Sequence, residues 1–413
     1  MDGSRGLLMP KGCWWYGRTP GTILALLFFV GNESITESIM KTVIHGKWIY
    51  VCALLLVMNT AGAAAQQGKL RVGFLCEAGP DEPFWEQVVR VMHAAANDLN
   101  VELIVKYDPT RSTYTTKKIG EQFIDSEPKL DYLLTKYLRS VTATHIEHAR
   151  RRGIKVFVFN SDIPEPEYDV VGRLPREKYA NWIGHMVPDD KMAGYDLAGA
   201  LIEGARRAKG DGQIDKIRIL GLEAPHESTV GSSRRAGLVE KVAEAPDVVL
   251  QGGILTDWES SAAMPRIVEA LEAHADTDIL WSPNVGITWG AVLAVEQLGK
   301  VPGKDIQVGG FDWDSDTTKG IADGRITASM FGHFLQGAWA LILVHDYHYS
   351  YDFADSPGVR MFTPLSIMNA ENYNGYKAGV LERDWEEIDF RKFSKKYNPQ
   401  LKTYNFSISQ FLK

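Results

Sequence analysis

Short runs of apolar residues recur along this chain, and a stretch with helical spacing of apolar residues follows nearly every run. Residues 70–75, 101–105 and 156–159 are largely apolar runs, and residues 84–99 have the spacing of an amphipathic helix. A strand that is apolar along its whole length must be covered on both faces, which is typical of a parallel sheet with helices on each side. The alternation therefore predicts an α/β fold.

The alternation occurs twice, on either side of a stretch rich in proline and charge at residues 162–181. In the second half, helical stretches separate further apolar runs, at residues 217–220, 248–250, 279–281 and 306–310. We predict two doubly wound, Rossmann-like domains with parallel sheets, joined by a hinge of three crossovers near Gly184, Gly332 and Ser356. The first domain would hold residues 66–184 and 333–356, and the second residues 185–332 and 357–413, including a tail to which the sequence assigns no function.

The N-terminal segment has the three parts of a secretory signal. Lys41 and Lys47 precede an apolar run at residues 48–58, and small residues occupy positions 61–65. A basic region, an apolar stretch of about 7–15 residues and a small-residue cleavage site form such a signal, and a membrane span would need about 20 apolar residues. We expect export to the periplasm and cleavage before Gln66, with residues 1–65 dispensable for the fold.

Charge and motifs exclude several classes of function. The formal net charge of −7 disfavours a nucleic-acid-binding surface, which normally carries a basic excess. The sequence contains no G-x-S-x-G, H-E-x-x-H or P-loop motif, so we expect neither a catalytic residue nor a cofactor. Only Cys76 would remain after cleavage, which leaves no internal disulfide in the mature protein.

One acidic segment has calcium-loop spacing. Asp312, Asp314 and Asp316, with Asp323 at the twelfth place, resemble the start and end of such a loop. However, Thr317 stands at the sixth place, where the loop needs glycine, and aspartate replaces the usual glutamate at the twelfth. We therefore expect Asp314 and Asp316 to cap a helix, and we predict no metal site.

Polar and aromatic residues follow the predicted strands, at the edge where open parallel sheets bind their ligands. Carboxylates accept hydrogen bonds from sugar hydroxyls, guanidinium groups donate to them, and amides do both. Each type also has a structural alternative, since an asparagine can cap a turn, an aromatic pair can pack a helix face, and neighbouring arginines can be solvated. Together they predict a site for a monosaccharide or related polyol, formed by Glu82, Phe84, Trp85, Asn160, Ser161, Arg234, Asn284 and Asp312.

With these residues the chain resembles the type I periplasmic sugar-binding proteins, the family of ribose-binding protein, over about residues 69–370. DEPFW at 81–85 resembles the family turn N-P-F-F, RRAG at 234–237 the motif R-x-x-G, and GGFD at 309–312 the motif V-G-F-D, whose aspartate binds sugar hydroxyls. Asn284 matches a family asparagine, and His333 lies near a family glutamine. The resemblance implies a ligand in a cleft between two closing domains, with Arg234 and Asp312 facing water when the cleft is empty.

Three features depart from the family pattern. Glu82 stands where the family has asparagine, Asn160 and Ser161 stand where it has an Asp-Arg pair, and the stretch 162–181 is longer than usual. In these features the chain is similar to the receptors for autoinducer-2, which have the same fold. The resemblance implies a monomer that captures a sugar-like ligand for an ABC transporter, or alternatively a receptor that signals to a membrane sensor kinase or chemoreceptor.

Overall fold

The computed structural model describes residues 69–110, 112–210, 216–225, 228–256, 258 and 260–412. The expected signal segment, residues 1–65, lies outside this part of the chain. Among the helices of the described residues, none is both long enough and apolar enough to span a membrane.

The first sheet collects strands from the N-terminal part of the chain and one strand from near its end. Its members are β1 (Leu70–Cys76), β2 (Val101–Tyr107), β3 (Tyr132–Thr135), β4 (Lys155–Phe159), β5 (Trp182–Pro188) and β11 (Arg360–Thr363). They lie in the order β11-β5-β4-β3-β1-β2, and neighbouring strands run parallel throughout. An order that grows in both directions from β1 and β3 is that of a doubly wound sheet.

The second sheet repeats this arrangement. Its strands are β6 (Ile217–Glu223), β7 (Val248–Leu255), β8 (Ile279–Trp281), β9 (Gln307–Phe311), β10 (Ala328–Phe331) and β12 (Ser366–Met368). They lie in the order β12-β10-β9-β8-β6-β7, and of the described strands β12 alone runs antiparallel to its neighbour. The predicted fold of two doubly wound α/β sheets is confirmed.

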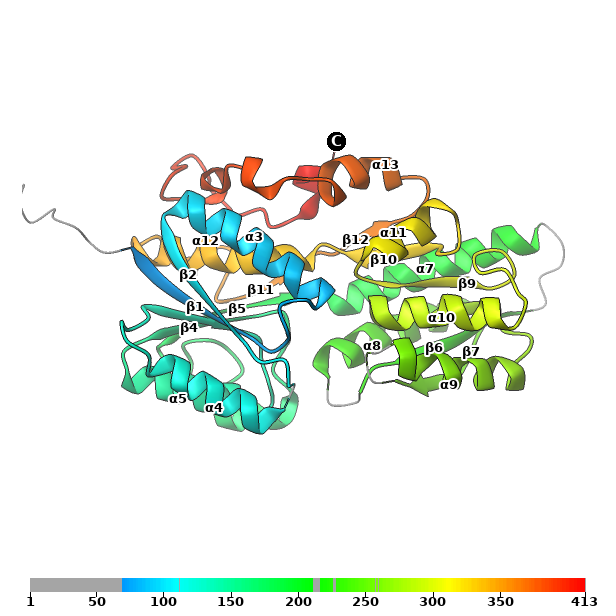
Figure 1. The fold of residues 1–413 in the computed structure, drawn as a ribbon, viewed down its shortest axis with the longest axis horizontal. Helices are drawn as coiled ribbons and strands as arrows, with labels where there is room; N and C mark the ends of the chain where they lie inside the picture. The colour runs from blue at the N-terminus through cyan, green and yellow to red at the C-terminus, as the bar shows by residue number, and fades with distance from the viewer. Residues whose placement is uncertain are drawn as a thin grey trace, which may run out of the picture. The chain divides into compact units, whose positions relative to one another are not determined.

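Helices cover both faces of the first sheet, as its apolar strands require (Figure 1). On one face, α3 (Pro83–Leu99) packs against α12 (Gln336–His348), and on the other α4 (Thr113–Ile124) packs against α5 (Thr142–Arg151). Glu82 caps α3 by accepting a hydrogen bond from the Trp85 backbone N–H at 2.9 Å, and Pro83 occupies the first turn, which is a favoured helix start. This cap aims the start of α3 at the carboxyl edge of the sheet.

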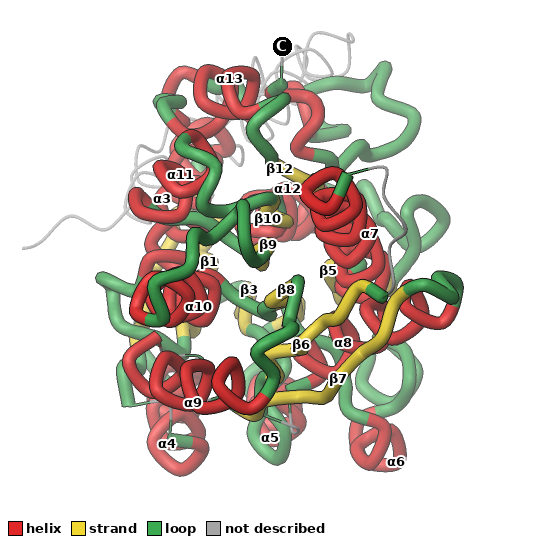
Figure 2. Tube along the Cα trace, turned by 90° about the vertical axis from the view of Figure 1, so that its right-hand side faces the viewer, coloured by secondary structure: helices red, strands yellow, loops and turns green. Residues whose placement is uncertain are grey.

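Helices cover the second sheet in the same way (Figure 2). α7 (Asp190–Lys209) and α8 (Thr229–Ala243) lie on one face, and α9 (Ser260–Ala273) and α10 (Val285–Gln297) lie on the other. α7 and α8 approach closely because each contributes a glycine: a Cβ on Gly194 would collide with the Arg234 carbonyl, and one on Gly237 with the Lys191 carbonyl. This contact fixes the height of Arg234 relative to the start of α7.

The chain passes between the sheets three times, at the joins β5–α7, β10–α12 and β11–β12. The first crossing follows Pro188 and the third follows Thr363, whereas we predicted them near Gly184 and Ser356. Both displacements arise because β11 pairs with the full carboxyl half of β5, from His185 to Pro188. We propose domain borders that follow these strand ends.

The C-terminal tail packs on α12. After α13 (Tyr373–Tyr376) it continues through a π-helical turn and three 3-10 turns, the last at Ile408–Phe411, and it runs along the same side as α3 and α12 (Figure 1). Four tail rings surround the buried Trp339 of α12 with centroids 5.1–6.3 Å away, those of Phe390, Phe393, Phe406 and Phe411. α12 is therefore buried on the side that α3 leaves uncovered.

Candidate ligand-binding site

The centre of the candidate site is a buried ion pair on the second sheet. Arg234, on α8, is 2% exposed, and its Nε donates to Oδ1 of Asp190 at 2.8 Å. Its Nη1 donates to the Pro283 carbonyl at 2.6 Å, and the guanidinium carbon lies 4.0 Å from the centre of the Phe311 ring. The expectation that Arg234 faces water is therefore wrong for this structure, because Asp190 and Phe311 enclose it.

Two residues from neighbouring strand ends complete this group. Asp312 follows β9 with a φ of 66°, and His333 follows β10 after Gly332, whose φ is 123°. The His333 Nε2 atom lies 3.2 Å from Asp312 Oδ1 and 3.3 Å from Arg234 Nη2. We call Asp190, Arg234, Asp312 and His333 the Arg234 cluster.

Burial sets the ionisation of the cluster. Burial raises the pKa of Asp312 to about 7, against the attraction of Arg234 and with the repulsion of Glu82 and Asp190. Burial likewise raises the pKa of Asp190 to about 6, although Arg234 counteracts it. Burial and the charge of Arg234 both hold the pKa of His333 well below its usual value, so that its imidazole is neutral.

The first sheet contributes the start of α3. The Phe84 ring stacks on the His333 ring with centroids 4.7 Å apart and planes at 29°. Glu82, besides capping α3, is close enough to raise the pKa of Asp312. Trp85, by contrast, is 8% exposed and packs on Phe74 and Phe159, at 5.9 and 6.3 Å between centroids. The structure thus brings Glu82 and Phe84 to the Arg234 cluster and leaves Trp85 behind them.

The other predicted residues lie at the same sheet edges with partners of their own. Ser161 donates to the Tyr137 carbonyl at 2.9 Å. Asn284 caps α10, since its Oδ1 accepts from the Ile287 N–H at 2.9 Å and its Nδ2 donates to the Trp258 carbonyl at 3.0 Å. Asn284 therefore caps a helix, and its contact with a ligand stays a prediction.

Asn160, immediately after β4, has a φ of 76°, and its backbone N–H donates to the Met186 carbonyl at 3.0 Å. This hydrogen bond joins the end of β4 to β5. The left-handed φ and this hydrogen bond define the backbone of Asn160 at the strand end.

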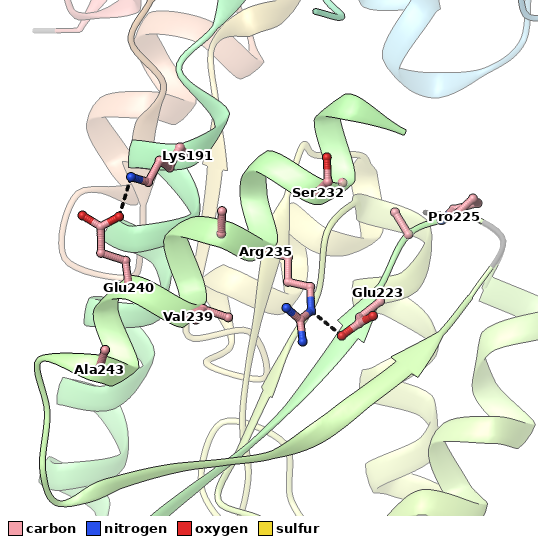
Figure 3. Close-up of a pocket in the computed structure, with 11 residues that line it drawn as sticks. Lys191, Glu223, Pro225, Ser232, Arg235, Val239, Glu240 and Ala243 are labelled. Carbon is pink, nitrogen blue, oxygen red and sulfur yellow. Dashed lines mark hydrogen bonds and ion pairs between the residues drawn. The ribbon is translucent and has the colours of Figure 1, made fainter. Parts of the chain in front are cut away.

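Arg234 and Arg235 have opposite environments. Arg235 faces a groove of about 740 Å³ on the outer side of α8, where its Nε contacts Glu223 Oε1 at 2.5 Å (Figure 3). Lys191 and Glu240 form a second ion pair at the rim of this groove, also at 2.5 Å. Of the two neighbouring arginines, Arg235 is the solvated one, and Arg234 points to the interior.

Sequence reasoning missed Asp190. This residue begins α7 directly after β5, so the search of strand ends would have found it had β5 been recognised. Lys136, which was not predicted either, follows β3 and pairs at 3.0 Å with the buried Glu77 after β1. Burial raises the pKa of Glu77, and Lys136 opposes this effect.

The two sheets also meet beside the Arg234 cluster. The Thr229 hydroxyl, at the start of α8, donates to the Asp162 carbonyl at 3.2 Å. Asp162 lies at the start of the long stretch 162–181, and its carboxylate pairs with Arg360 of β11 at 2.5 Å. The stretch that departs from the family pattern therefore supplies a direct contact between the two halves of the fold.

The calcium-like segment forms a helix start. Asp314 accepts from the backbone N–H groups of Asp316 and Thr317 and caps α11 (Ser315–Ala322). Its predicted capping role is confirmed, whereas Asp316 lies within the first turn and does not cap it. Within the described ranges, no three His, Cys, Asp or Glu side chains are grouped so that they could hold a metal ion.

The fold has two sheets covered by helices, and the Arg234 cluster lies at the strand ends of the second sheet, where Phe84 from the first contacts it. A model of the periplasmic binding protein domain matches residues 72–347, and the chain belongs to this family.

Individual relatives are more distant. The galactofuranose-binding protein YtfQ of Escherichia coli is 29% identical over 25% of this chain and 35% of its own length. The ribose import binding protein RbsB of Salmonella typhimurium is 26% identical over 36% of this chain and 46% of its own length. The chain thus matches less than half the length of either relative.

A solved structure is similar over much more of the chain. A periplasmic sugar-binding protein from Pseudomonas fluorescens is 25% identical, covers 83% of this chain and all of its own, and superposes with a TM-score of 0.73. The resemblance to type I periplasmic sugar-binding proteins is confirmed at the level of family and fold.

Proposed function

We propose that this protein is a binding protein, not an enzyme, and that it holds a neutral monosaccharide or a closely related polyol. The observation that carries the proposal is the contact of Arg234, Asp312 and Phe84 with one residue, His333. Arg234 offers a hydrogen-bond donor, Asp312 an acceptor and Phe84 an apolar face, which are the groups that a hydroxylated ring needs. The names of the three relatives, which mention galactofuranose, ribose and a sugar, support it.

The complete proposed site adds residues from both sheet edges. Phe84 covers one face of the sugar, and Trp85 supports Phe84 from behind with their rings 5.0 Å apart. Glu82, Asn160 and Ser161 complete the first side, and Asn284 and Asp190 complete the second.

We further infer that the protein acts in the periplasm as a monomer and delivers its ligand to an ABC transporter. Support comes from the family, from the word import in the name of one relative, and from the signal-like composition of residues 40–65. Export of the protein would be tested by N-terminal sequencing of the periplasmic fraction.

The charges of the site define a ligand class that a thermal-shift screen can test. Glu82 and Asp190 act on Asp312 together with the single guanidinium of Arg234, so a further negative charge on the ligand would be repelled. We expect a neutral aldose to raise the melting temperature, since ligand at 100 times Kd adds about 2.7 kcal/mol of stability. The uronic acid of the same sugar should bind at least about tenfold more weakly.

The screen includes ribose, arabinose, galactose and autoinducer-2, with Asp312→Ala as the control variant that should lose the shift. Equal affinity for the aldose and its uronic acid would refute the charge argument. A shift with autoinducer-2 and none with any sugar would favour the receptor alternative.

The two aromatic residues should differ when each is truncated. Phe84→Ala should weaken sugar binding at least about tenfold, because it removes the ring that stacks on His333. Trp85→Ala should instead lower the free energy of unfolding by about 3–5 kcal/mol, because it leaves a hole between Phe74 and Phe159. Sugar titration and denaturant unfolding of both variants measure the difference, and a stable Trp85→Ala protein that fails to bind would reverse the two roles.

A further inference from the structure

The Nε2 atom of His333 has two neighbours that require opposite hydrogen-bond roles of it. Nη2 of Arg234, at 3.3 Å, can only donate a hydrogen bond. Oδ1 of Asp312, at 3.2 Å, can only accept one when the carboxylate is ionised. The ring is 4% exposed and its other nitrogen, Nδ1, has no hydrogen-bond partner among the described residues.

A neutral imidazole cannot satisfy both neighbours. With the ring proton on Nε2, His333 donates to the Asp312 carboxylate and presents an N–H to the N–H of Arg234. With the proton on Nδ1, the Nε2 lone pair accepts from Arg234 and repels an ionised Asp312. The second arrangement is favourable only when Asp312 carries a proton.

We propose that the protonation of Asp312 determines whether Nε2 of His333 accepts a hydrogen bond from Arg234 or donates one to Asp312. A sugar hydroxyl that donates to Asp312 displaces the Asp312 proton to solvent. Ligand binding therefore weakens in acid. The proposal rests on the proposed sugar-binding function. It assigns to His333 a positioning role that depends on which of its ring nitrogens carries the proton.

The charged groups around Asp312 favour such a change near neutral pH. Glu82 faces it from the start of α3, Asp190 from the start of α7 and Arg234 from α8. Burial and the two carboxylates raise the pKa of Asp312 to about 7, while Arg234 lowers it. Both forms of Asp312 are therefore populated in the ligand-free protein near pH 7.

The sign of the effect follows from linkage. A hydroxyl that donates to the carboxylate lowers the pKa of Asp312 in the complex, so binding releases a proton and is strongest at high pH. With a pKa of about 7 in the free protein, the ionised fraction falls from about nine-tenths at pH 8 to about one-tenth at pH 6. The dissociation constant should then rise about tenfold between these two values.

His333→Gln is the decisive variant. A glutamine amide has an oxygen that accepts from Arg234 and an NH₂ that donates to Asp312 at the same time, so it satisfies both neighbours without a change of tautomer. Its dissociation constant should change about threefold or less between pH 8 and pH 6. His348→Gln is the matched control and should keep the tenfold dependence, because His348 lies at the C-terminal end of α12 and its ring contacts those of Tyr132 and Tyr349.

Calorimetric titration with ribose, arabinose and galactose measures both quantities. Repeating the titration at pH 7 in phosphate and in Tris, which have different ionisation heats, should show about half a proton released per sugar bound to the wild type. A sugar that binds the wild type equally well at pH 6 and pH 8 would overturn the proton linkage and leave the proposed function intact. Failure of all these sugars to bind at either pH would count against the proposed function instead.

The ligand-free protein gives an independent test. In a sample with ¹³C-labelled aspartate, the carboxyl carbon of Asp312, assigned by its loss in Asp312→Asn, should titrate near pH 7 in the wild type. In His333→Gln it should titrate at least about one pH unit lower, because the amide N–H stabilises the ionised form. An ordinary aspartate titration in the wild type would overturn the proposal whether or not a sugar has been found.

Discussion

Arg234→Ala should lower the free energy of unfolding of the ligand-free protein by about 3–5 kcal/mol, because the change leaves the Asp190 carboxylate buried without its partner. Asp190 is 4% exposed, and the Arg234 Nε atom at 2.8 Å is its ion-pair partner. Sugar affinity should fall at least about tenfold as well, since a charge-assisted donor is lost. Denaturant unfolding and sugar titration measure the two effects separately.

The loss of stability should depend on pH in a defined direction. Burial already raises the pKa of Asp190 to about 6 in the presence of Arg234, and removing the arginine should raise it further. When the pKa of a carboxyl group is higher in the folded protein than its unfolded value of about 3.9, the protein becomes less stable as pH rises from the unfolded to the folded pKa. The deficit of Arg234→Ala relative to the wild type should therefore be larger at pH 8 than at pH 5.

A second substitution distinguishes an unpaired charge from a simple packing defect. Adding Asp190→Asn to Arg234→Ala removes the buried charge and should recover about 1–3 kcal/mol of stability, whereas sugar binding should stay weak. If the double variant is no more stable than Arg234→Ala, the ion pair is not what stabilises this part of α7 and α8. If Arg234→Ala binds sugar like the wild type, the Arg234 cluster is structural and the proposed site is wrong.

The sequence was sufficient to predict every strand that is long and apolar. The runs at 70–75, 101–105 and 156–159 became β1, β2 and β4, because strands covered by helices on both faces need apolar residues throughout. β5 was not predicted, since its sequence WIGHMVP carries glycine, histidine and proline. The short strands β10, β11 and β12 were not predicted because each contains a polar residue, as in ASMF, RMFT and SIM. The equally short β8, with the wholly apolar sequence ILW, was predicted.

The candidate site could be predicted only in part, for a related reason. The strand-end rule located Arg234 and Asp312 by their positions along the chain, but the partner of Arg234 follows β5 and was missed with it. The positions of residues along the chain also do not show which side chains are buried. The strand-end rule therefore gave Phe84 and Trp85 the same role, whereas in the structure Phe84 stacks on His333 and Trp85 packs on Phe74. Neighbours in sequence diverge because successive helix positions face different sides of the helix.

The tail offers the second large effect, through a single carboxylate on α12. Asp346 is fully buried and accepts hydrogen bonds from the Ser394 hydroxyl at 2.5 Å, the Lys395 N–H at 2.5 Å and the Tyr404 hydroxyl at 2.8 Å. Burial raises the pKa of Asp346, but the hydrogen bonds from His345, Ser394, Tyr404 and Lys395 outweigh burial and hold the pKa below its usual value. The Asp346 carboxylate thus holds the tail against α12 at two places, at Ser394 with Lys395 and at Tyr404.

Asp346→Ala should lower the free energy of unfolding by about 3–5 kcal/mol, because it leaves the buried hydroxyls of Ser394 and Tyr404 and the part-buried Lys395 N–H without their acceptor. The tail should also detach locally, so that trypsin cleaves at Lys392, Lys395 and Lys396 before any site in the two sheets. Acid should affect the two proteins differently. A depressed carboxyl pKa stabilises the wild type above about pH 4, and this contribution is lost as pH falls, whereas the variant lacks it at every pH.

Glu382→Gln is the matched control for this effect, since the pair of Glu382 and Lys377 is exposed and should contribute at most about 1 kcal/mol. Detachment of the tail should also affect the ligand site, because tail residues cover both sides of the turn that carries His333. Trp385 packs on Phe334 with centroids 5.7 Å apart, and a Cβ on Gly332 would lie 3.3 Å from Ile408. We therefore expect Asp346→Ala, but not Glu382→Gln, to weaken sugar binding; unchanged affinity in a variant whose tail is cleaved would show that the tail stabilises α12 without positioning His333.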